Sequence, residues 1–294
     1  MKKVFLTFDI DPDFFFLKNK KYKWKGFKLG VVNLYNSLNK KFKTNIKITW
    51  FLRIDNEIES IYGKSDYLYH KYYDIIKFIK SKNGLICLHP HLMKKINNSV
   101  WENDTNISSN LTQLRKIFKT TKKLKHIDSK IIRFGNFHFS QEILDFLIKK
   151  KVKVDSSSFP GRNDFLWKNS PKKPFYFERK YKISERFLNK AKDIIEVPVT
   201  TYRVKADYDK YKRLRYLDLT TKHNIFKKYI NSINFSSNYF VSLSHPGNLF
   251  DYKIKHGLLG FGVKNFIKNL DLIKKKLARF SGNDVIFENF DYFK

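Results

Sequence analysis

Residues 4–16 read VFLTFDIDPDFFF, an apolar run that carries Asp9, Asp11 and Asp13 at every second position. The apolar part is typical of a buried β-strand, whereas unpaired carboxylates are costly to bury. Both features fit a buried strand whose carboxyl end opens onto a cleft, because the carboxylates then leave the core. The stretch therefore predicts a strand that ends at a functional site.

The rest of the chain alternates between two kinds of segment. Short apolar runs rich in β-branched and aromatic residues are separated by stretches such as SQEILDFLIKKK, in which apolar residues recur with helical spacing. Ser140 is placed to cap the helix in that stretch. Strands alternating with helices favour parallel βαβ units. The predicted strands are 4–10, 46–54, 84–92, 130–136, 151–158, 194–202, 238–247 and 283–290.

Seven or eight parallel strands separated mainly by helices predict a (β/α) barrel, with a doubly wound open sheet as the alternative. No internal repeat or linker divides the 294 residues, so we expect one domain over 1–294. Two connections, 159–193 and 203–237, are longer than the barrel needs. We expect them at the face where a barrel places its active site.

The composition limits the classes of function. The formal net charge of +33 raises nucleic acid or an anionic membrane surface as partners. Because the lysines are spread along the chain, we predict no dedicated nucleic-acid site, while peripheral contact with an anionic membrane stays open. The one cysteine, Cys87, excludes an intrachain disulfide. Neither a signal peptide nor an apolar run of ~18 residues is found, so a cytoplasmic protein is expected.

Chemically useful side chains stand at the ends of the predicted strands, which meet at one cleft in a barrel. Two Asp at i, i+2 share one side of a strand, as do two His, and such pairs can aim several ligands at one divalent cation. For any one of these residues taken alone, a turn or loop role is the simpler interpretation. The residues are Asp9, Asp11, Arg53, Asp55, His89, His91, Arg133, Asp155, Glu196 and His245.

The order of these motifs resembles that of the polysaccharide deacetylases, the NodB-homology superfamily of metal-dependent carbohydrate esterases that includes carbohydrate esterase family 4. TFDID is similar to their first motif, Thr-Phe-Asp-Asp, with one residue inserted, and TWFLRID is similar to a strand that follows it. LHPHL, IIRFGNFHF, VDSSSFPG and VSLSHPG are similar to the later motifs that supply two His, an Arg, an Asp and a His. The resemblance runs in order from residue 4 to about residue 250.

The chain departs from the family pattern in its spacing. The family's two Asp are adjacent and its two His have three residues between them, whereas this chain has Asp-x-Asp and His-x-His. Its third motif also lacks the usual prolines. Asp13 could therefore replace Asp11, and His91 could orient a substrate instead of binding metal. His138 could also reach the cleft.

The resemblance implies a metal-dependent hydrolase that removes an acetyl or other small acyl group from an amino sugar, in surface polysaccharide or glycoconjugate biosynthesis. Asp11, His89 and His91 would hold a divalent ion, with zinc expected. Because no secretion signal is found, we expect the substrate to be a nucleotide- or lipid-linked sugar rather than finished cell wall. The alternatives are a hydrolase of a non-sugar amide on the same fold and a non-catalytic barrel that binds glycans or polyanions.

The resemblance also implies the acid and base of the reaction. Asp9 would be the general base and His245 the general acid. Arg133 would keep Asp9 ionised and oriented, and Asp155 would favour the protonated form of His245. An ordinary structural ion pair is the simpler interpretation of Arg133 and Asp155.

Overall fold

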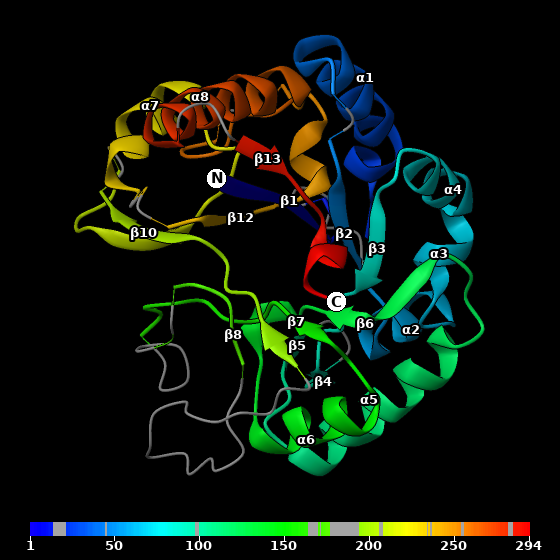
Figure 1. Ribbon diagram of the computed structural model, residues 1–294. Helices are drawn as coiled ribbons and strands as arrows, with labels where there is room; N and C mark the ends of the chain where they lie inside the picture. Colours follow the sequence, from blue (N-terminus) through cyan, green and yellow to red (C-terminus); the bar gives the residue numbers. More distant parts are fainter. Residues whose placement is uncertain are drawn as a thin grey trace.

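The computed structural model describes residues 1–13, 22–44, 46–97, 100–163, 170, 172–176, 194–205, 208–233, 235, 237–253, 256–281 and 285–294. Residues 164–169, 171 and 177–193 of the long connection predicted at 159–193 lie outside this part. The predicted (β/α) barrel is confirmed, because seven parallel strands curl into a half-barrel with helices outside it (Figure 1). The strands surround a shared interior and do not form the open doubly wound sheet.

The order of the strands across the sheet places both ends of the chain side by side. The parallel strands, in that order, are β12 (Tyr239–Ser244), β1 (Lys2–Ile10), β2 (Ile48–Leu52), β3 (Leu85–Leu88), β6 (Ile127–Ile132), β7 (Val154–Asp155) and β9 (Ile195–Glu196). β8 (Phe175–Tyr176) pairs antiparallel with β9. The strand predicted at 283–290 is shorter, since β13 (Val285–Phe287) pairs only with the start of β1 and is followed by the 3₁₀ turn η6 (Phe290–Phe293).

Helices cover the outside of the sheet (Figure 1). Their apolar faces pack against it, and the side chains of Asp55, Asn106 and Ser140 cap the starts of three of them. Ser140 Oγ accepts a hydrogen bond from Ile143 N at 3.3 Å, as predicted. None of these helices has the length and apolar character that a membrane crossing requires. The helices are α1 (Val31–Phe42), α2 (Asn56–Tyr62), α3 (Tyr67–Lys71), α4 (Tyr73–Ser81), α5 (Ile107–Thr121), α6 (Gln141–Lys149), α7 (His223–Tyr229) and α8 (Val263–Ser281).

Two antiparallel hairpins extend from the carboxyl ends of barrel strands. One, β4 (Met93–Lys95) with β5 (Trp101–Asn103), follows β3. The other, β10 (Thr201–Val204) with β11 (Arg213–Tyr216), follows β9 and occupies part of the connection predicted at 203–237. Its base bridges the space between β9 and β12, because Thr200 N donates to Val241 O at 3.0 Å and Leu243 N donates to Leu217 O at 2.9 Å.

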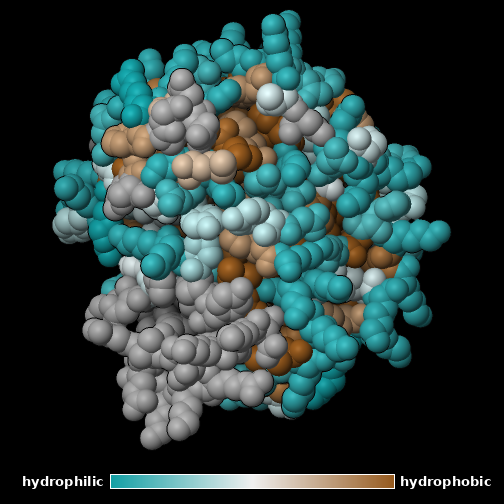
Figure 2. All heavy atoms as spheres, in the orientation of Figure 1, coloured by the Kyte–Doolittle hydropathy of each residue, from teal (hydrophilic) through white to brown (hydrophobic). Residues whose placement is uncertain are grey.

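The alternation of side chains along β1 separates an inner and an outer core. Leu6 and Phe8 pack outward with the helices, whereas Phe5 packs inward with residues such as Phe51 and Phe290. Thr7 and Asp9 continue the inward row beyond Phe5, so the barrel interior becomes polar toward the carboxyl ends of the strands. Outside the core, the face of the molecule seen in Figure 2 is mostly hydrophilic, as the dispersed lysines led us to expect.

Candidate metal centre and active site

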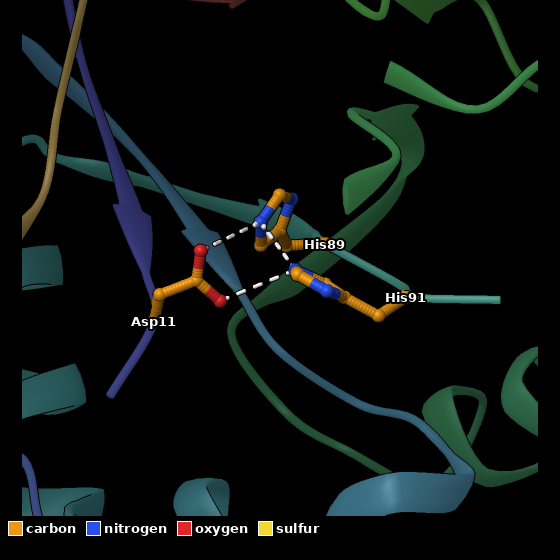
Figure 3. A group of neighbouring side chains, drawn as sticks. All are labelled: Asp11, His89 and His91. Atoms are coloured by element: carbon orange, nitrogen blue, oxygen red, sulfur yellow. Dashed lines mark hydrogen bonds and ion pairs between the residues drawn. The ribbon is translucent and has the colours of Figure 1, made fainter. Parts of the chain in front are cut away.

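Asp11, His89 and His91 come together at the carboxyl ends of β1 and β3, with their polar atoms pointing toward one another (Figure 3). One ligand atom from each of the three lies within 4.8 Å of the others. His91 Nε2 is 3.2 Å from both Asp11 Oδ1 and His89 Nε2, and His89 Nε2 is 3.7 Å from Asp11 Oδ2. Asp11 N donates to Asp9 O at 2.8 Å, and this tight turn brings both aspartates to the same cleft.

The three residues fit a divalent cation. Asp11 Oδ1 is buried and receives no hydrogen bond from the described part of the chain, which leaves it open to a positively charged ligand. His89 Nδ1 donates to Arg133 O at 2.8 Å, so its Nε2 presents a lone pair to the cluster. Two imidazole nitrogens and one carboxylate form a donor set that suits zinc and related ions.

The ionisable groups of the cluster shift one another's pKa. Burial opposes the charge of Asp11, but the three surrounding histidines hold the pKa of its carboxyl well below the ordinary range. Burial and the nearby Arg53 lower the pKa of His91. For His89, burial would lower the pKa, yet the charges of Asp9 and Asp11 raise it. A neutral His91 beside an ionised Asp11 is the protonation state that metal binding requires.

Asp9 lies beside this cluster and is held by Arg133, as the sequence predicted. Arg133 Nη1 donates to Asp9 Oδ1 at 2.8 Å and to Thr7 Oγ1 at 2.7 Å. The same guanidinium is fixed from behind by Ser156, whose carbonyl and hydroxyl oxygens lie 3.1 and 2.9 Å from Nε and Nη2. Asp9 Oδ2 is directed to the cluster and lies 3.8 Å from His89 Nε2.

His245 approaches the cluster from β12. Its Nε2 lies 3.5 Å from Asp11 Oδ2. Burial would lower the pKa of His245, but Asp11, Asp9 and Asp218 raise it. Asp218 follows β11 and is fixed in turn, because its Oδ1 accepts hydrogen bonds from Ser244 Oγ at 2.8 Å and from Thr220 Oγ1 at 2.7 Å. Sequence reasoning missed Asp218, because it placed the connection 203–237 at the active-site face without singling out any one acidic residue in it.

Asp155 does not accompany His245 as the sequence predicted. Val154 packs in the inner core, so its neighbour Asp155 faces outward, where it lies opposite Glu196 in the pairing of β7 with β9. Its Oδ1 accepts from Ser157 Oγ at 2.5 Å. Burial raises the pKa of Asp155 to about 7, and burial also raises that of Glu196. The charge predicted for Asp155 beside His245 is supplied by Asp218 instead.

Arg53, which the sequence placed at the same cleft, lies beside Asp11 of the candidate metal cluster. Its Nη1 is 3.6 Å from Asp11 Oδ1, its Nε donates to Asp55 Oδ2 at 2.6 Å, and its Nη2 pairs with Glu57. Asp55 also caps α2 by accepting from Ile58 N at 3.0 Å. The guanidinium is thereby held against Asp11 by the start of a helix.

The two undecided residues lie outside the cluster. Asp13 is buried and accepts hydrogen bonds from Lys25 N at 2.5 Å and Tyr252 Oη at 2.7 Å, so it fixes the turn before α1. His138 Nε2 contacts Asn110 Nδ2 of α5 at 3.3 Å. Asp11 and His91, not Asp13 and His138, are therefore the residues that the structure brings to His89.

No family model and no curated protein sequence matches the chain. Among solved structures, the chain is similar to a protein of Mycobacterium smegmatis that is provisionally described as a polysaccharide deacetylase, with 14% identity and a TM-score of 0.56 over 99% of this chain and 87% of that one. A weaker similarity links it to a Bordetella bronchiseptica protein provisionally described as a polysaccharide deacetylase of O-antigen biosynthesis, with 12% identity, a TM-score of 0.40 and coverage of 96% and 80%. The Mycobacterium structure shows that this chain has the same fold.

Proposed function

We propose that this chain is a metal-dependent hydrolase that removes an acetyl or other small acyl group from an amino sugar. The observation that supports this best is the convergence of Asp11, His89 and His91, with Asp9 and His245 both adjacent to Asp11 or His89. The shared fold with a protein provisionally described as a polysaccharide deacetylase supports the same reaction class, although a fold alone does not determine function.

Asp11, His89 and His91 would hold the divalent ion, with zinc expected. Such an ion polarises the acyl carbonyl and lowers the pKa of bound water toward ~7. Arg53, 3.6 Å from Asp11, restrains that carboxylate from the side of α2. The ring of His89 is restrained by the carbonyl of Arg133, so two of the three ligands have a fixed orientation.

Asp9 is the proposed general base. The Arg133 guanidinium occupies its Oδ1, which leaves Oδ2 on the side of the cluster to accept a proton from the attacking water. Arg133 is itself fully buried and anchored to Ser156. The base therefore cannot turn away from the cleft without breaking a charged hydrogen bond, and positioned proton transfer of this kind contributes ~10²–10⁴-fold to a rate.

His245 is the proposed general acid, which gives its proton to the leaving amine. Because its pKa is raised, the imidazole of His245 stays protonated up to a higher pH than the imidazole of an ordinary histidine. Asp218 would take the role first assigned to Asp155, because its negative charge favours the imidazolium. The cationic Arg133 beside Asp9 favours an ionised base, and the carboxylates beside His245 favour a protonated acid. Such a pair of oppositely charged groups suits acid and base catalysis.

We further propose a single cytoplasmic domain that acts on a nucleotide- or lipid-linked amino sugar. The pairing of β1 with β12 joins the two ends of the chain in one sheet, which supports a single domain. The net charge of +33 would attract a phosphate-bearing substrate, and an anionic membrane surface in the same way.

The test combines metal content and turnover on protein purified without a His-tag. We expect about one zinc or similar ion per chain, lost in His89→Ala, and release of acetate from a panel of N-acetylated amino sugars. Asp9→Asn should retain the metal and lose at least ~10²-fold in kcat. Turnover confined to linear or cyclic amides would favour the non-sugar alternative. A metal-free protein that binds glycans in the presence of chelator would replace the hydrolase by a binding barrel.

A further inference from the structure

Exposed apolar side chains gather at the hairpin tips, the turns that join β4 to β5 and β10 to β11. Of the eight large hydrophobic side chains that are exposed in the described part of the chain, four lie there. They are Ile96 (50% exposed), Val100 (47%), Tyr208 (54%) and Tyr211 (67%). Because both hairpins follow the carboxyl ends of strands in one parallel barrel, both tips belong to the end of the molecule that holds the candidate metal centre.

The fold holds these side chains in water. In the first hairpin, Ile96 N donates to Val100 O at 2.9 Å and closes the turn. In the second, Arg215 Nη2 donates to Asp209 Oδ2 at 2.6 Å, and the guanidinium carbon of Arg215 lies 5.8 Å from the ring centroid of Tyr208. Apolar side chains that are grouped and fixed at the surface are typical of an interaction site.

Positive charge surrounds these apolar side chains. The two hairpins, residues 93–103 and 201–216, carry eight basic and three acidic residues. Two of the acidic side chains are paired with basic side chains of their own hairpin. Lys210 and Lys212 stand on either side of Tyr211, are exposed and make no ion pair with any residue that the structure describes. Tyrosine rings prefer the boundary between lipid and water, and lysines beside them are attracted to anionic headgroups.

We propose that the hairpin tips dock on an anionic lipid bilayer, with Ile96, Val100 and Tyr211 entering the lipid and the lysines at headgroup level. The aliphatic side chains favour a bilayer over a polyanion in solution, because they find no apolar complement on a chain of phosphates. The face that docks is the one at which the barrel strands end, so a lipid-linked amino sugar would reach the site without leaving the membrane. The inference rests on the proposed function for that substrate but not for the docking.

The orientation is tested in the full chain with a tryptophan placed at either end of the barrel. Tyr211→Trp labels a hairpin tip. Phe280→Trp is the matched control, because Phe280 is 62% exposed at the end of α8, which leads to β13 beside the start of β1. The vesicles contain phosphatidylglycerol and phosphatidylcholine with brominated acyl chains, and bromine quenches a tryptophan that reaches those chains. Relative to wild type, we expect added quenching in Tyr211→Trp and none in Phe280→Trp.

Charge reversal tests the same surface by cosedimentation with these vesicles. At 0.15 M salt the Debye length is about 8 Å, so only charges near the bilayer contribute strongly. Lys210→Glu combined with Lys212→Glu should weaken binding more than about tenfold. The control combines Lys149→Glu with Lys150→Glu at the end of α6, which leads into the start of β7 at the opposite end of the barrel. It changes the net charge equally and should weaken binding less than about threefold.

The inference would be overturned by the absence of binding to vesicles that contain phosphatidylglycerol, by equal quenching at the two ends, or by equal effects of the two charge reversals. Binding without acyl-chain quenching of Tyr211→Trp would overturn it too, since adsorption by charge alone would then account for the binding. Docking through the hairpin tips without acetate release from any N-acetylated sugar would remove the proposed function and leave this inference standing. Acetate release by a protein that binds no vesicles would do the reverse.

Discussion

Arg133 shows how much of the site depends on one buried charge. Its side chain is fully buried and joins Asp9, Thr7 and Ser156 through hydrogen bonds, while its guanidinium carbon lies 4.2 Å from the ring centroid of Phe51. Buried charges are tolerated only when they are paired and hydrogen-bonded. Arg133 is therefore both a stabilising residue and the residue that orients the proposed base.

Removing this guanidinium should damage stability and activity together. We expect Arg133→Met to lower the free energy of unfolding by about 3–5 kcal/mol, because it leaves Asp9 as a buried unpaired carboxylate. Urea denaturation and acetate release measure the two effects. Arg133→Lys keeps the charge but not the planar fork of donors, so it should recover part of the stability and little of the activity. Equal stability of Arg133→Met and wild type would show that Asp9 is not held by this pair.

At the scale of elements, the loop that carries His245 is fixed by a very close approach. The π-helical turn η2 (Gly26–Gly30) packs on η5 (Pro246–Leu249), which begins one residue after His245. A Cβ on Gly26 would lie 2.0 Å from Pro246 O and 2.4 Å from Gly247 Cα. Only glycine lets the two turns approach this closely, so Gly26 sets the position of the proposed acid without touching it.

Gly26→Ala should therefore displace the loop of His245. We expect a stability loss of about 1–3 kcal/mol from overpacking and a fall in kcat of at least tenfold per folded molecule. Gly63→Ala is the control, since Gly63 has φ +81° and no atom within 4 Å of its Cβ position. It should cost about 1 kcal/mol through backbone strain alone and leave kcat unchanged. Parallel losses of kcat in both variants would argue against a role for the Gly26 contact.

Two buried carboxyl groups on neighbouring strands, Asp155 of β7 and Glu196 of β9, make the stability of the fold depend on pH. Asp155 and Glu196 face each other across the two strands, and each has an oxygen without a hydrogen bond in the described part of the chain. Burial raises the pKa of Asp155 to about 7, with Arg133 and Ser157 opposing the rise, and burial together with Asp155 raises that of Glu196. The folded state therefore binds these protons more tightly than the unfolded chain.

This stabilisation is fully present below about pH 4, where an unfolded Asp is also protonated, and it is lost as the pH rises through about 7. Urea denaturation gives the free energy of unfolding of Asp155→Asn and of wild type at each pH. We expect the difference between the two proteins to shift in favour of Asp155→Asn by on the order of 2–3 kcal/mol from pH 5 to pH 8. Asp74→Asn is the control, because the Asp74 side chain is 92% exposed. An Asp155→Asn variant with the wild-type pH dependence would exclude this pair as its source.

The sequence predicted the barrel and the position of Asp9 at the cleft, because the alternation of side chains along a strand and the spacing of apolar residues along a helix are visible within short segments. The side on which Asp155 faces could not be read from KVKVDSSS, because Val152 and Val154 have the same parity but pack in different cores, Val152 with the helices and Val154 inside the barrel. The place of Asp218 could not be predicted, because it depends on how an irregular connection returns to β12. Likewise, the sequence 285–290 carries a strand pattern, but the strand stops at Phe287 and the chain turns into η6 from Phe290.

For the molecule as a whole, metal binding should be visible as added stability. A ligand that binds only the folded state adds about 2.7 kcal/mol when present at 100 times its Kd. We expect zinc to raise the Tm of wild type and of His70→Ala, whose imidazole lies on the exposed side of α3, and to leave His89→Ala unchanged. A zinc-induced rise that survives in His89→Ala would place the ion elsewhere.

The position of β1 between β2 and β12 separates two events in the folding of this chain. The proposed metal ligands all lie in the first 91 residues, at the ends of β1 and β3, and only β2 separates these two strands in the sheet. His245 arrives only when β12 pairs with β1 across some 235 residues of chain. Such distant pairings are slow because a long loop must close first. In a refolding experiment, ion capture should therefore precede the return of turnover, and the delay between the two signals would time the closure of the barrel.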